Sequence, residues 1–444
     1  MGEGKTFNRW LVVVGALLIQ VSLGAIYIYS VFKPGLKDNF PGWSDTDLAL
    51  PSQLVLLCFA LGVVIFGRIQ DKTGPRIIAT LGGILLGIGL LLASFAPNLM
   101  VFVLGFSVIG GFGIGAAYVC PIATCVKWFP DKRGLITGMA VAGFGAGGLV
   151  FTPVAKSLIA SVGPMSTFLY LGIIFLVAVV IGAQLMVNPP AGYKPAGWNP
   201  PAAAAGAGAL KADYTWQEMI KTPQFWLLWL TYFAGCTAGL MVIMNVTNVY
   251  QSCSLLELVN KISPIPKDTF GECLSQAASA VIIVSILNAA GRIGWGKVSD
   301  NIGRKGTLLI MFLCSGAIML LLNWFTSFPM YIFGVASVGF CFGGFLALYP
   351  AVTADYFGTK NVGANYGFMF MAYGAGGLFG PWLPPKLMVV LQKISYETVD
   401  KAGGVILKSY NAGNYLMAFV IAGIMCLVSA GLILIIKPPA VKAK

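Results

Sequence analysis

The sequence contains no histidine, and charged residues make up only 10% of its 444 positions. The absence of histidine excludes histidine-based acid–base catalysis, imidazole proton relays and histidine-ligated metal sites. The nine cysteines include no C-x-x-C pair, and most lie in apolar segments, where cysteine behaves as a small hydrophobic residue. A soluble globular protein has about 25% charged residues, so this few cannot cover a water-facing surface. The composition therefore indicates a membrane protein.

Long apolar stretches are abundant, since 58% of the residues are hydrophobic. The hydrocarbon core of a bilayer is about 30 Å thick, and about 20 apolar residues of α-helix cross it. Twelve stretches are long enough: 10–32, 48–70, 76–96, 99–125, 134–158, 165–187, 224–250, 276–300, 306–326, 329–354, 362–390 and 413–437. An even number of spans places both termini on one side. Most of the 28 Lys and Arg flank the spans on that side, which predicts cytoplasmic termini.

The widest gap between the predicted spans covers residues 188–223. Its stretch PPAGYKPAGWNPPAAAAGAGA has no sustained apolar face, which is typical of a linker. The chain is therefore predicted to contain a six-helix bundle at 1–187, a cytoplasmic linker at 188–223 and a second six-helix bundle at 224–444. The net charge of +13 comes mostly from short loops, so we expect a lipid bilayer and no nucleic acid as a partner.

The two predicted bundles share a repeat at a constant offset of 229 residues. Three residues of one loop recur in another: Gly67, Asp71 and Gly74 correspond to Gly296, Asp300 and Gly303. The strings FGAGGL and YGAGGL, which begin at positions 144 and 373, recur at the same offset. Parallel six-helix repeats are an arrangement of secondary transporters, which bind substrate between the halves. The sequence therefore predicts an all-α membrane protein of twelve helices in two parallel repeats.

The repeated segments GRIQDKTGPR and GKVSDNIGRK resemble the signature loop of the major facilitator superfamily. They follow the second and eighth predicted spans, where that family carries the loop, and the resemblance extends over the whole chain. It implies the major facilitator fold, with a gating and structural role for eight residues: Gly67, Asp71, Gly74, Arg76, Gly296, Asp300, Gly303 and Arg304. Their charged side chains can pair with helix ends on the cytoplasmic face, which would stabilise an outward-open state.

One charged residue lies deep inside a predicted span and outside the repeat. Arg292 belongs to the span 276–300, and its repeat counterpart is Val63. An arginine within the membrane is costly and is a functional hypothesis by default, and its planar fork suits a carboxylate. All fifteen acidic residues map to loops or helix ends, so a substrate carboxylate is the simplest partner. Pairing with carbonyl groups or with Asp300 is the alternative.

Several polar side chains accompany Arg292 as candidates. Asn288 lies one helical turn before it on the same face, where it can hold the guanidinium or bind a substrate. Tyrosines within spans offer a ring for packing and a hydroxyl that can donate. The candidates of this kind are Tyr27, Tyr29, Tyr118 and Tyr373. Each of them alone is more often a packing residue than a ligand.

The outer loop between the spans 224–250 and 276–300 is longer than its repeat counterpart. It holds Cys253 and Cys273, and in the predicted topology it faces an oxidising compartment. A disulfide between the two cysteines and a pair of free thiols are both compatible with this placement.

Within the superfamily the chain resembles the branch of the oxalate/formate antiporter and the monocarboxylate transporters. The resembling segments are KWFPDKRG (127–134), PPAGYKPAGW (189–198), KTPQFW (221–226) and NYGFMF (365–370). The resemblance implies a substrate site formed by Arg292, Tyr118 and Tyr27, with an aromatic cage that includes Phe342 and Phe370.

At two positions the chain differs from members of this branch, and both differences bear on the substrate or the coupling. The oxalate carrier has a second cation, a lysine, where this chain has Tyr373, so the resemblance favours a monocarboxylate over a dicarboxylate. Monocarboxylate transporters often carry an aspartate where this chain has Asn288, which leaves proton coupling open.

We therefore expect a secondary transporter of a small monocarboxylate such as lactate or pyruvate, working by alternating access with proton symport. Exchange of carboxylates is the alternative mechanism, and a membrane sensor without transport is the alternative of another class. The sequence has no recognisable nucleophile, acid–base pair or metal cluster, so no enzyme activity, cofactor or metal is expected. The expected setting is a monomer in the bacterial inner membrane.

Overall fold

The computed structural model describes residues 8–190, 192–195, 213–259, 265–325, 327–399 and 405–439. The first part of the chain forms α1 (Arg9–Leu23), η1 (Gly24–Ile28), α2 (Tyr29–Asn39), α3 (Asp45–Thr73), α4 (Pro75–Ser94), α5 (Leu99–Phe102), η2 (Val103–Ile109), α6 (Gly110–Trp128) and α7 (Arg133–Gln184). The second part forms α9 (Trp216–Met219), α10 (Pro223–Val259), α11 (Lys267–Ile302), α12 (Arg304–Leu321), η3 (Leu322–Trp324), α13 (Phe328–Phe357), α14 (Val362–Leu387), β1 (Val389–Val399), β2 (Val405–Asn414) and α15 (Leu416–Ile435).

Ten helical stretches of the described residues are long and apolar enough to cross a membrane. One of them, α7, contains two of the expected spans, because Gly163 with a φ of 81° interrupts the helix just before Pro164. The expected span 362–390 corresponds to α14, which is rich in glycine and proline and is not among the ten. When α7 is counted as two spans and α14 is added, the helices match the twelve expected spans.

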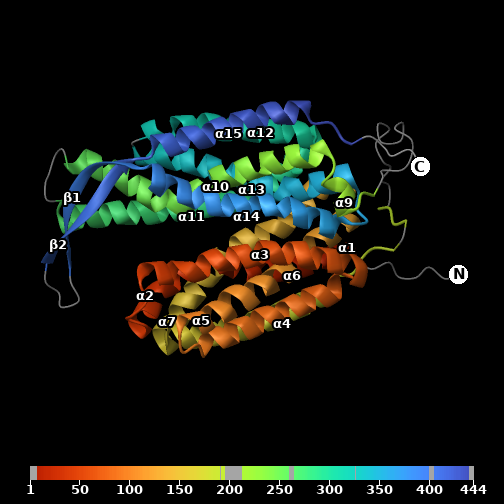
Figure 1. Ribbon diagram of the computed structural model, residues 1–444, viewed down its shortest axis with the longest axis horizontal. Coiled ribbons are helices and arrows are strands. Elements are labelled where there is room, and N and C mark those ends of the chain that lie inside the picture. Colours follow the sequence, from red (N-terminus) through yellow and green to blue (C-terminus); the bar gives the residue numbers. More distant parts are fainter. Residues whose placement is uncertain are drawn as a thin grey trace.

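The helices form two groups that lie side by side (Figure 1). The first helix group is α1–α7, and the second helix group is α10–α15. Both ends of the described chain lie at one end of the molecule, which we name the termini end, and β1 and β2 lie at the opposite, hairpin end. Of the predicted linker 188–223, residues 191 and 196–212 lie outside the described residues, and its last part contains α9. The domain boundaries remain a prediction.

Two helix pairs join the helix groups, and glycine lets both pairs approach closely. A Cβ atom on Gly67 of α3 would lie 2.3 Å from the carbonyl oxygen of Gly363 in α14. A Cβ atom on Gly296 of α11 would likewise lie 2.3 Å from the carbonyl oxygen of Gly134 in α7. Gly296 and Gly363 are the repeat counterparts of Gly67 and Gly134, so the repeat in the sequence becomes a two-fold related contact between the groups.

The hairpin is an element that the helix-based prediction did not include. β1 and β2 pair antiparallel, and Ile265, between α10 and α11, pairs in parallel with Tyr396 of β1. The Ile265 N–H donates to the carbonyl oxygen of Ser395 at 3.0 Å, and the Glu397 N–H donates to that of Ile265 at 3.1 Å. These bonds join the connection between α10 and α11 to the connection between α14 and α15.

The structure describes the side chain of only one of the two cysteines that the sequence left as a disulfide or as free thiols. Cys273 is a buried free thiol, and the side chain of Cys253 lies outside the described residues. The prediction placed both cysteines in an extended outer loop. Instead, α10 continues to Val259 and α11 begins at Lys267, so both positions belong to helices.

Candidate functional site

Arg292 of α11 lies between the two helix groups and is only 1% exposed. Its Nε and Nη2 atoms donate to Asn288 Oδ1 at 3.1 and 2.9 Å, and Nη1 donates to the carbonyl oxygen of Val141 at 2.5 Å. The Asn288 amide in turn donates to the carbonyl oxygen of Gly339 at 3.2 Å. The four-residue spacing on α11 thus holds the guanidinium in one orientation, as expected for side chains on one helical face.

The guanidinium keeps donor capacity and an uncompensated charge. Arginine has five N–H donors, and the three hydrogen bonds above occupy three of them. Within the described part of the chain, Arg292 forms no ion pair with a carboxylate. A buried charge is costly unless it is paired, so the arrangement is suited to an anion that arrives from outside the protein.

A glycine of the first helix group gives the guanidinium its space. A Cβ atom on Gly145 of α7 would lie 3.1 Å from Arg292 Cζ, which is tighter than ordinary van der Waals contact. About two turns earlier in α7, a Cβ atom on Gly138 would lie 2.1 Å from the Arg292 carbonyl oxygen. The α7 helix therefore runs directly against α11 at this level, and its glycines are required by close approach.

Aromatic rings from both helix groups surround this region. The hydroxyl groups of Tyr27 and Tyr373 lie 2.9 Å apart, so a hydrogen bond joins the first helix group to α14. The Tyr27 hydroxyl also interacts electrostatically with the Arg292 guanidinium. The Phe370 ring lies 4.7 Å from that of Tyr373 and 5.2 Å from that of Tyr118, centroid to centroid. The predicted residues Tyr27, Tyr118, Phe370 and Tyr373 thus come together.

Two further phenylalanines belong to the same cluster and were not predicted. The Phe59 ring lies 4.9 Å from Tyr118 and 5.2 Å from Phe370, and the Phe144 ring lies 5.1 Å from Tyr118. Phe144 is the repeat counterpart of Tyr373 and begins the string FGAGGL, so the repeat itself could have identified it. Phe59 is the repeat counterpart of Asn288 and could have been found in the same way.

Phe342, the other aromatic residue that the resemblance implied, lies apart from the rings around Tyr118. It is buried in α13, where it packs against α10: a Cβ atom on Gly239 would lie 2.3 Å from its ring. Among the described residues it has no ring contact with the Tyr118 cluster. Phe342 therefore supports the wall formed by α10 and α13.

A break in the first span positions Tyr27. The regular helix α1 gives way to the short 3₁₀ segment η1 at Gly24, and Tyr27 lies in this segment. A Cβ atom on Gly24 would lie 2.0 Å from the carbonyl oxygen of Phe144, so α7 touches the backbone here. The change of helical pitch turns the Tyr27 ring toward Phe144, with a centroid distance of 5.4 Å.

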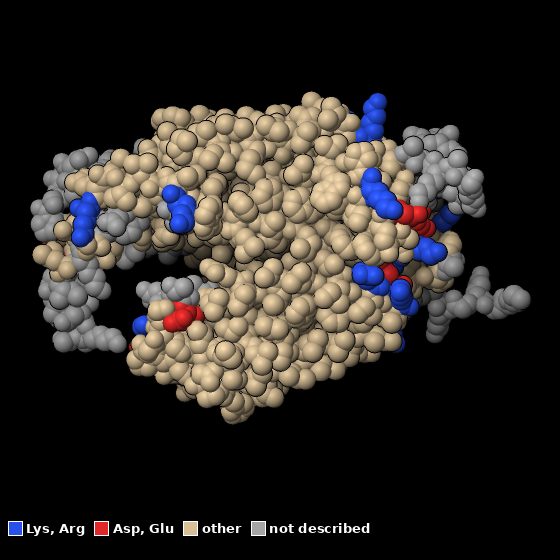
Figure 2. All heavy atoms as spheres, viewed as in Figure 1, with Lys and Arg blue, Asp and Glu red and all other residues tan. Residues whose placement is uncertain are grey.

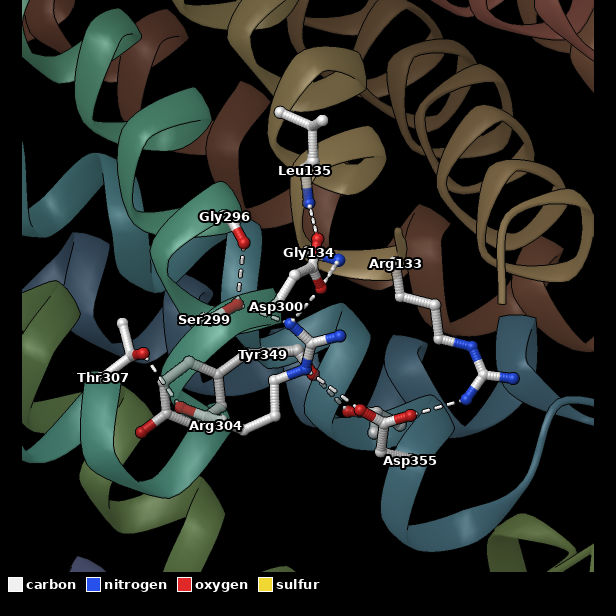
Figure 3. A network of polar contacts seen from close by, with 12 residues as sticks. Arg133, Gly134, Leu135, Gly296, Ser299, Asp300, Arg304, Thr307, Tyr349 and Asp355 are labelled. Carbon is white, nitrogen blue, oxygen red and sulfur yellow. Dashed lines mark hydrogen bonds and ion pairs between the residues drawn. The ribbon is translucent and has the colours of Figure 1, made fainter. Parts of the chain in front are cut away.

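The acidic residues of the repeated loops cap helices of the opposite group at the termini end. Asp71 of α3 accepts hydrogen bonds from the N–H groups of Gly363 and Ala364, at 3.2 and 2.7 Å. Asp300 of α11 accepts from the N–H groups of Gly134 and Leu135, at 2.9 and 2.8 Å (Figure 3). A carboxylate at a helix N-terminus accepts from backbone N–H groups that have no partner within the helix, and it is attracted by the positive end of the helix dipole. Both contacts therefore hold the two helix groups together.

The remaining loop residues have separate roles. Gly74 and Gly303 have φ values of 93° and 86°, a conformation that glycine adopts without strain, and each ends one helix where the next begins. Arg304 pairs with Asp300 at 2.8 Å, whereas Arg76 is exposed.

The two contacts at the termini end differ chemically. Beside α7 and α11, Arg133 pairs with Asp355 at 2.5 Å, and Asp355 also pairs with Arg304 at 3.0 Å (Figure 3). We name this network the ionic seam. The repeat counterparts of Asp355 and Arg133 are Val126 and Val362, which are buried together with Ala123 and Ala354. We name this cluster, beside α3 and α14, the apolar seam.

Comparison with known proteins extends these observations. A family model described as Major Facilitator Superfamily matches residues 12–259 and 257–444. The chain is 28% identical over 387 residues to the oxalate:formate antiporter of Oxalobacter formigenes, covering 85% of this chain and 84% of that protein. It is 27% identical over 416 residues to the apicoplast pyruvate carrier 1 of Toxoplasma gondii, covering 81% of this chain and 72% of that protein.

A solved structure supports the fold independently. The proton:xylose symporter XylE, bound to 6-bromo-6-deoxy-D-glucose, matches with a TM-score of 0.65 at 15% identity, covering 95% of this chain and 94% of that chain. At this identity the match bears on the fold alone. Two helix groups related by a sequence repeat, a buried arginine between them and a family match over nearly the whole length agree, and the chain belongs to the major facilitator superfamily of membrane transporters.

Proposed function

We propose that the protein transports a small monocarboxylate such as lactate or pyruvate, and that Arg292 binds its carboxylate. The observation that carries this proposal is a buried arginine that lacks a carboxylate partner among the described residues and has two N–H donors beyond the three that bond Asn288 and Val141. Two parallel N–H donors of a guanidinium can bind one carboxylate in a bidentate way. Asn288 and Val141 hold the arginine in place, and the substrate neutralises it.

The surrounding rings favour a small anion with a single charge. In this proposal the cluster of Tyr27, Phe59, Tyr118, Phe370 and Tyr373 encloses the apolar part of the substrate. Tyr373 contributes no cation, so one positive charge faces one negative charge. The oxalate:formate antiporter and the pyruvate carrier, by their names, both handle small carboxylates, which supports the substrate class.

Alternating access follows from the arrangement of the two seams. The termini end is closed by the ionic and apolar seams, whereas the surface is hollowed between the helix groups toward the hairpin end (Figure 2). With the termini in the cytoplasm, the substrate would enter from the hairpin end. Neutralisation of Arg292 would lower the cost of enclosing the site, and the helix groups would then rock until the seams part.

Proton symport is the proposed coupling, and exchange of carboxylates is the second candidate. Symport is favoured because a monovalent anion and one proton that move together carry no net charge across the membrane. Exchange is favoured by a specific observation: in the described part of the chain no acidic side chain contacts Arg292 or its tyrosine neighbours, so a dedicated proton carrier is not evident.

The decisive experiment removes the guanidinium. Arg292→Ala should weaken lactate or pyruvate binding at least about thirtyfold, because truncating one partner of a buried charge pair is costly. Binding is measured by ligand-dependent thermal shift and by uptake into proteoliposomes. Arg292→Lys, which keeps the charge but loses the fork, should have an intermediate effect. Lys297→Ala removes an exposed cation from the same helix and should bind normally.

The unfolding temperature without ligand shows whether each variant is folded. Uptake and thermal shift that are unchanged in a folded Arg292→Ala protein would exclude the proposed site. A wild-type protein that responds to no short-chain monocarboxylate would exclude the substrate class.

A further inference from the structure

The last part of the predicted linker is docked on the second helix group. The N–H of Tyr214 donates to the carbonyl oxygen of Phe357 at 2.9 Å. The Tyr214 carbonyl oxygen accepts from the side-chain amides of Asn361 and Asn365, both at 3.0 Å. Asp213 Oδ1 accepts from the N–H of Lys360 at 3.1 Å. These bonds fix Asp213 and Tyr214 to the connection between α13 and α14.

The short helix α9 follows directly and is fixed at its start. Thr215 and Glu218 form a capping box, in which each side chain accepts from the backbone N–H of the other residue. Met219 is fully buried at the other end of α9. The Trp216 ring, between these anchors, stacks on the Phe368 ring of α14 with a centroid distance of 4.7 Å and an interplanar angle of 8°.

The Trp216 ring also contacts the other helix group. The guanidinium carbon of Arg68, in α3, lies 4.7 Å from the centroid of the Trp216 ring. An arginine within about 6 Å of a tryptophan face forms a cation–π contact. Arg68 directly follows Gly67, the residue whose backbone touches Gly363. The linker therefore spans the contact of α3 with α14, beside the apolar seam.

We infer that residues Asp213–Met219 form a strap that holds the termini end closed, with Trp216 bound between Phe368 of one helix group and Arg68 of the other. The apolar seam has no counterpart of the Arg133–Asp355 ion pair, because Val362 and Val126 occupy those repeat positions. The strap supplies a charge-dependent contact on that side. Opening of the termini end must separate α3 from α14 and therefore Arg68 from Trp216.

Amide hydrogen exchange of the wild-type protein and its variants in lipid nanodiscs tests the strap. The amides of Gly363 and Ala364 report on the contact with α3, and those of Gly134 and Leu135 report on the contact with α11. Arg68→Gln and Trp216→Ala should each raise exchange at both sites about two- to fivefold, the range for one exposed cation–π contact. The double variant should show no larger increase than either single variant.

Two matched variants serve as controls. Lys297 is the repeat counterpart of Arg68, so Lys297→Gln makes the same charge change without a strap contact and should leave exchange unchanged. Trp216→Phe keeps an aromatic face and should retain part of the protection. Peptides of α4 report on overall folding in every variant.

The inference is overturned if Arg68→Gln leaves exchange at both sites unchanged, or if the effects of Arg68→Gln and Trp216→Ala add. It is also overturned if Trp216→Ala raises exchange only in the α14 peptide, because that result describes local loosening. The readout needs no substrate. A failure of the strap is therefore distinguishable from a failure of the proposed carboxylate site.

Discussion

At the scale of single residues, the buried arginine and its neighbours depart from the repeat. Arg292 and Asn288 correspond to Val63 and Phe59 in the first helix group. The same two levels of the fold therefore carry polar groups on one side of the interface and apolar groups on the other. A symmetric scaffold with an asymmetric lining is what an asymmetric ligand requires, since its carboxylate and its apolar end need different surroundings.

Tyr373 decides the charge of the site in the proposed function. Tyr373→Lys would place a second cation near Arg292, and two like charges in a buried site repel each other. We expect this variant to unfold at a lower temperature than the wild type without ligand. A dianion such as oxalate should restore stability, and the ratio of oxalate to lactate affinity should rise roughly tenfold, which corresponds to about 1.4 kcal/mol.

Thermal shift with both ligands measures this ratio. Tyr373→Phe is the matched control, because it removes the hydroxyl bonded to Tyr27 without adding charge, and its ratio should equal that of the wild type. An unchanged ratio in a folded Tyr373→Lys protein would contradict the charge-matching argument.

The residues that sequence reasoning could identify were those that stand out chemically. An arginine in an apolar span is detectable without coordinates, and so is an asparagine one turn away. Phe342 was assigned to the cage by resemblance alone, because an aromatic residue in a span gives no indication of which face it occupies. Phe59 and Phe144 were overlooked because apolar rings are common in membrane helices and only their contacts with Tyr118 distinguish them.

At the scale of helices and loops, the repeat predicts the interface between the groups but not its chemistry. Gly67 packs against Gly363, and its repeat counterpart Gly296 packs against Gly134. The cysteine-bearing outer loop and the hairpin could not be predicted in the same way. Their structure depends on pairing between Ile265 and Tyr396, which are far apart in the sequence and carry no shared pattern.

The ionic seam leads to an element-scale prediction. Asp300 caps α7 and also pairs with Arg304 at 2.8 Å. Asp71 caps α14 and accepts from the Gln70 amide at 2.8 Å, but its nearest cation, Lys127, lies 3.8 Å away. Asp300→Asn should therefore loosen the termini end more than Asp71→Asn. Loss of charge-assisted bonds of this kind costs on the order of 1.5–3 kcal/mol each.

Alkylation of the native Cys120 measures the loosening. This thiol is fully buried in α6, and its modification by a small maleimide is followed by peptide mass spectrometry. We expect the rate to rise in the order wild type, Asp71→Asn, Asp300→Asn. The reverse order for the two variants would show that the charged network is not the stronger contact.

At the scale of the whole molecule, symport predicts how much net charge crosses the membrane with each substrate. A monocarboxylate that moves with one proton carries no net charge across the membrane. Uptake of lactate into proteoliposomes should therefore accelerate several-fold under an inward proton gradient and should not respond to a potassium diffusion potential. Uptake that ignores the proton gradient but requires a carboxylate inside the vesicle would replace symport by exchange.

The membrane class and the two-group architecture follow from composition, span length and a constant offset, because these properties extend along the whole chain. The family follows from the resemblance of the two repeated loops to its signature. The structure of the linker could not be predicted from these properties. Its described part, from Asp213, has no apolar periodicity, yet it forms α9 and binds both helix groups through Trp216. Docking of this kind depends on surfaces that distant parts of the chain form, here α3 and α14.

The hairpin has a mechanical consequence for the opening at its end of the molecule. Backbone hydrogen bonds through Ile265 join the α10–α11 connection to the α14–α15 connection. The ends of four helices of the second group are therefore tied to one another at the hairpin end. In the described residues, the connection Phe40–Ser44 of the first group has no strand partner and is held by side-chain contacts, such as the stacked rings of Phe40 and Trp43. We therefore expect changes in the length of the segment around Ile265 to be tolerated only when its register with Tyr396 is kept.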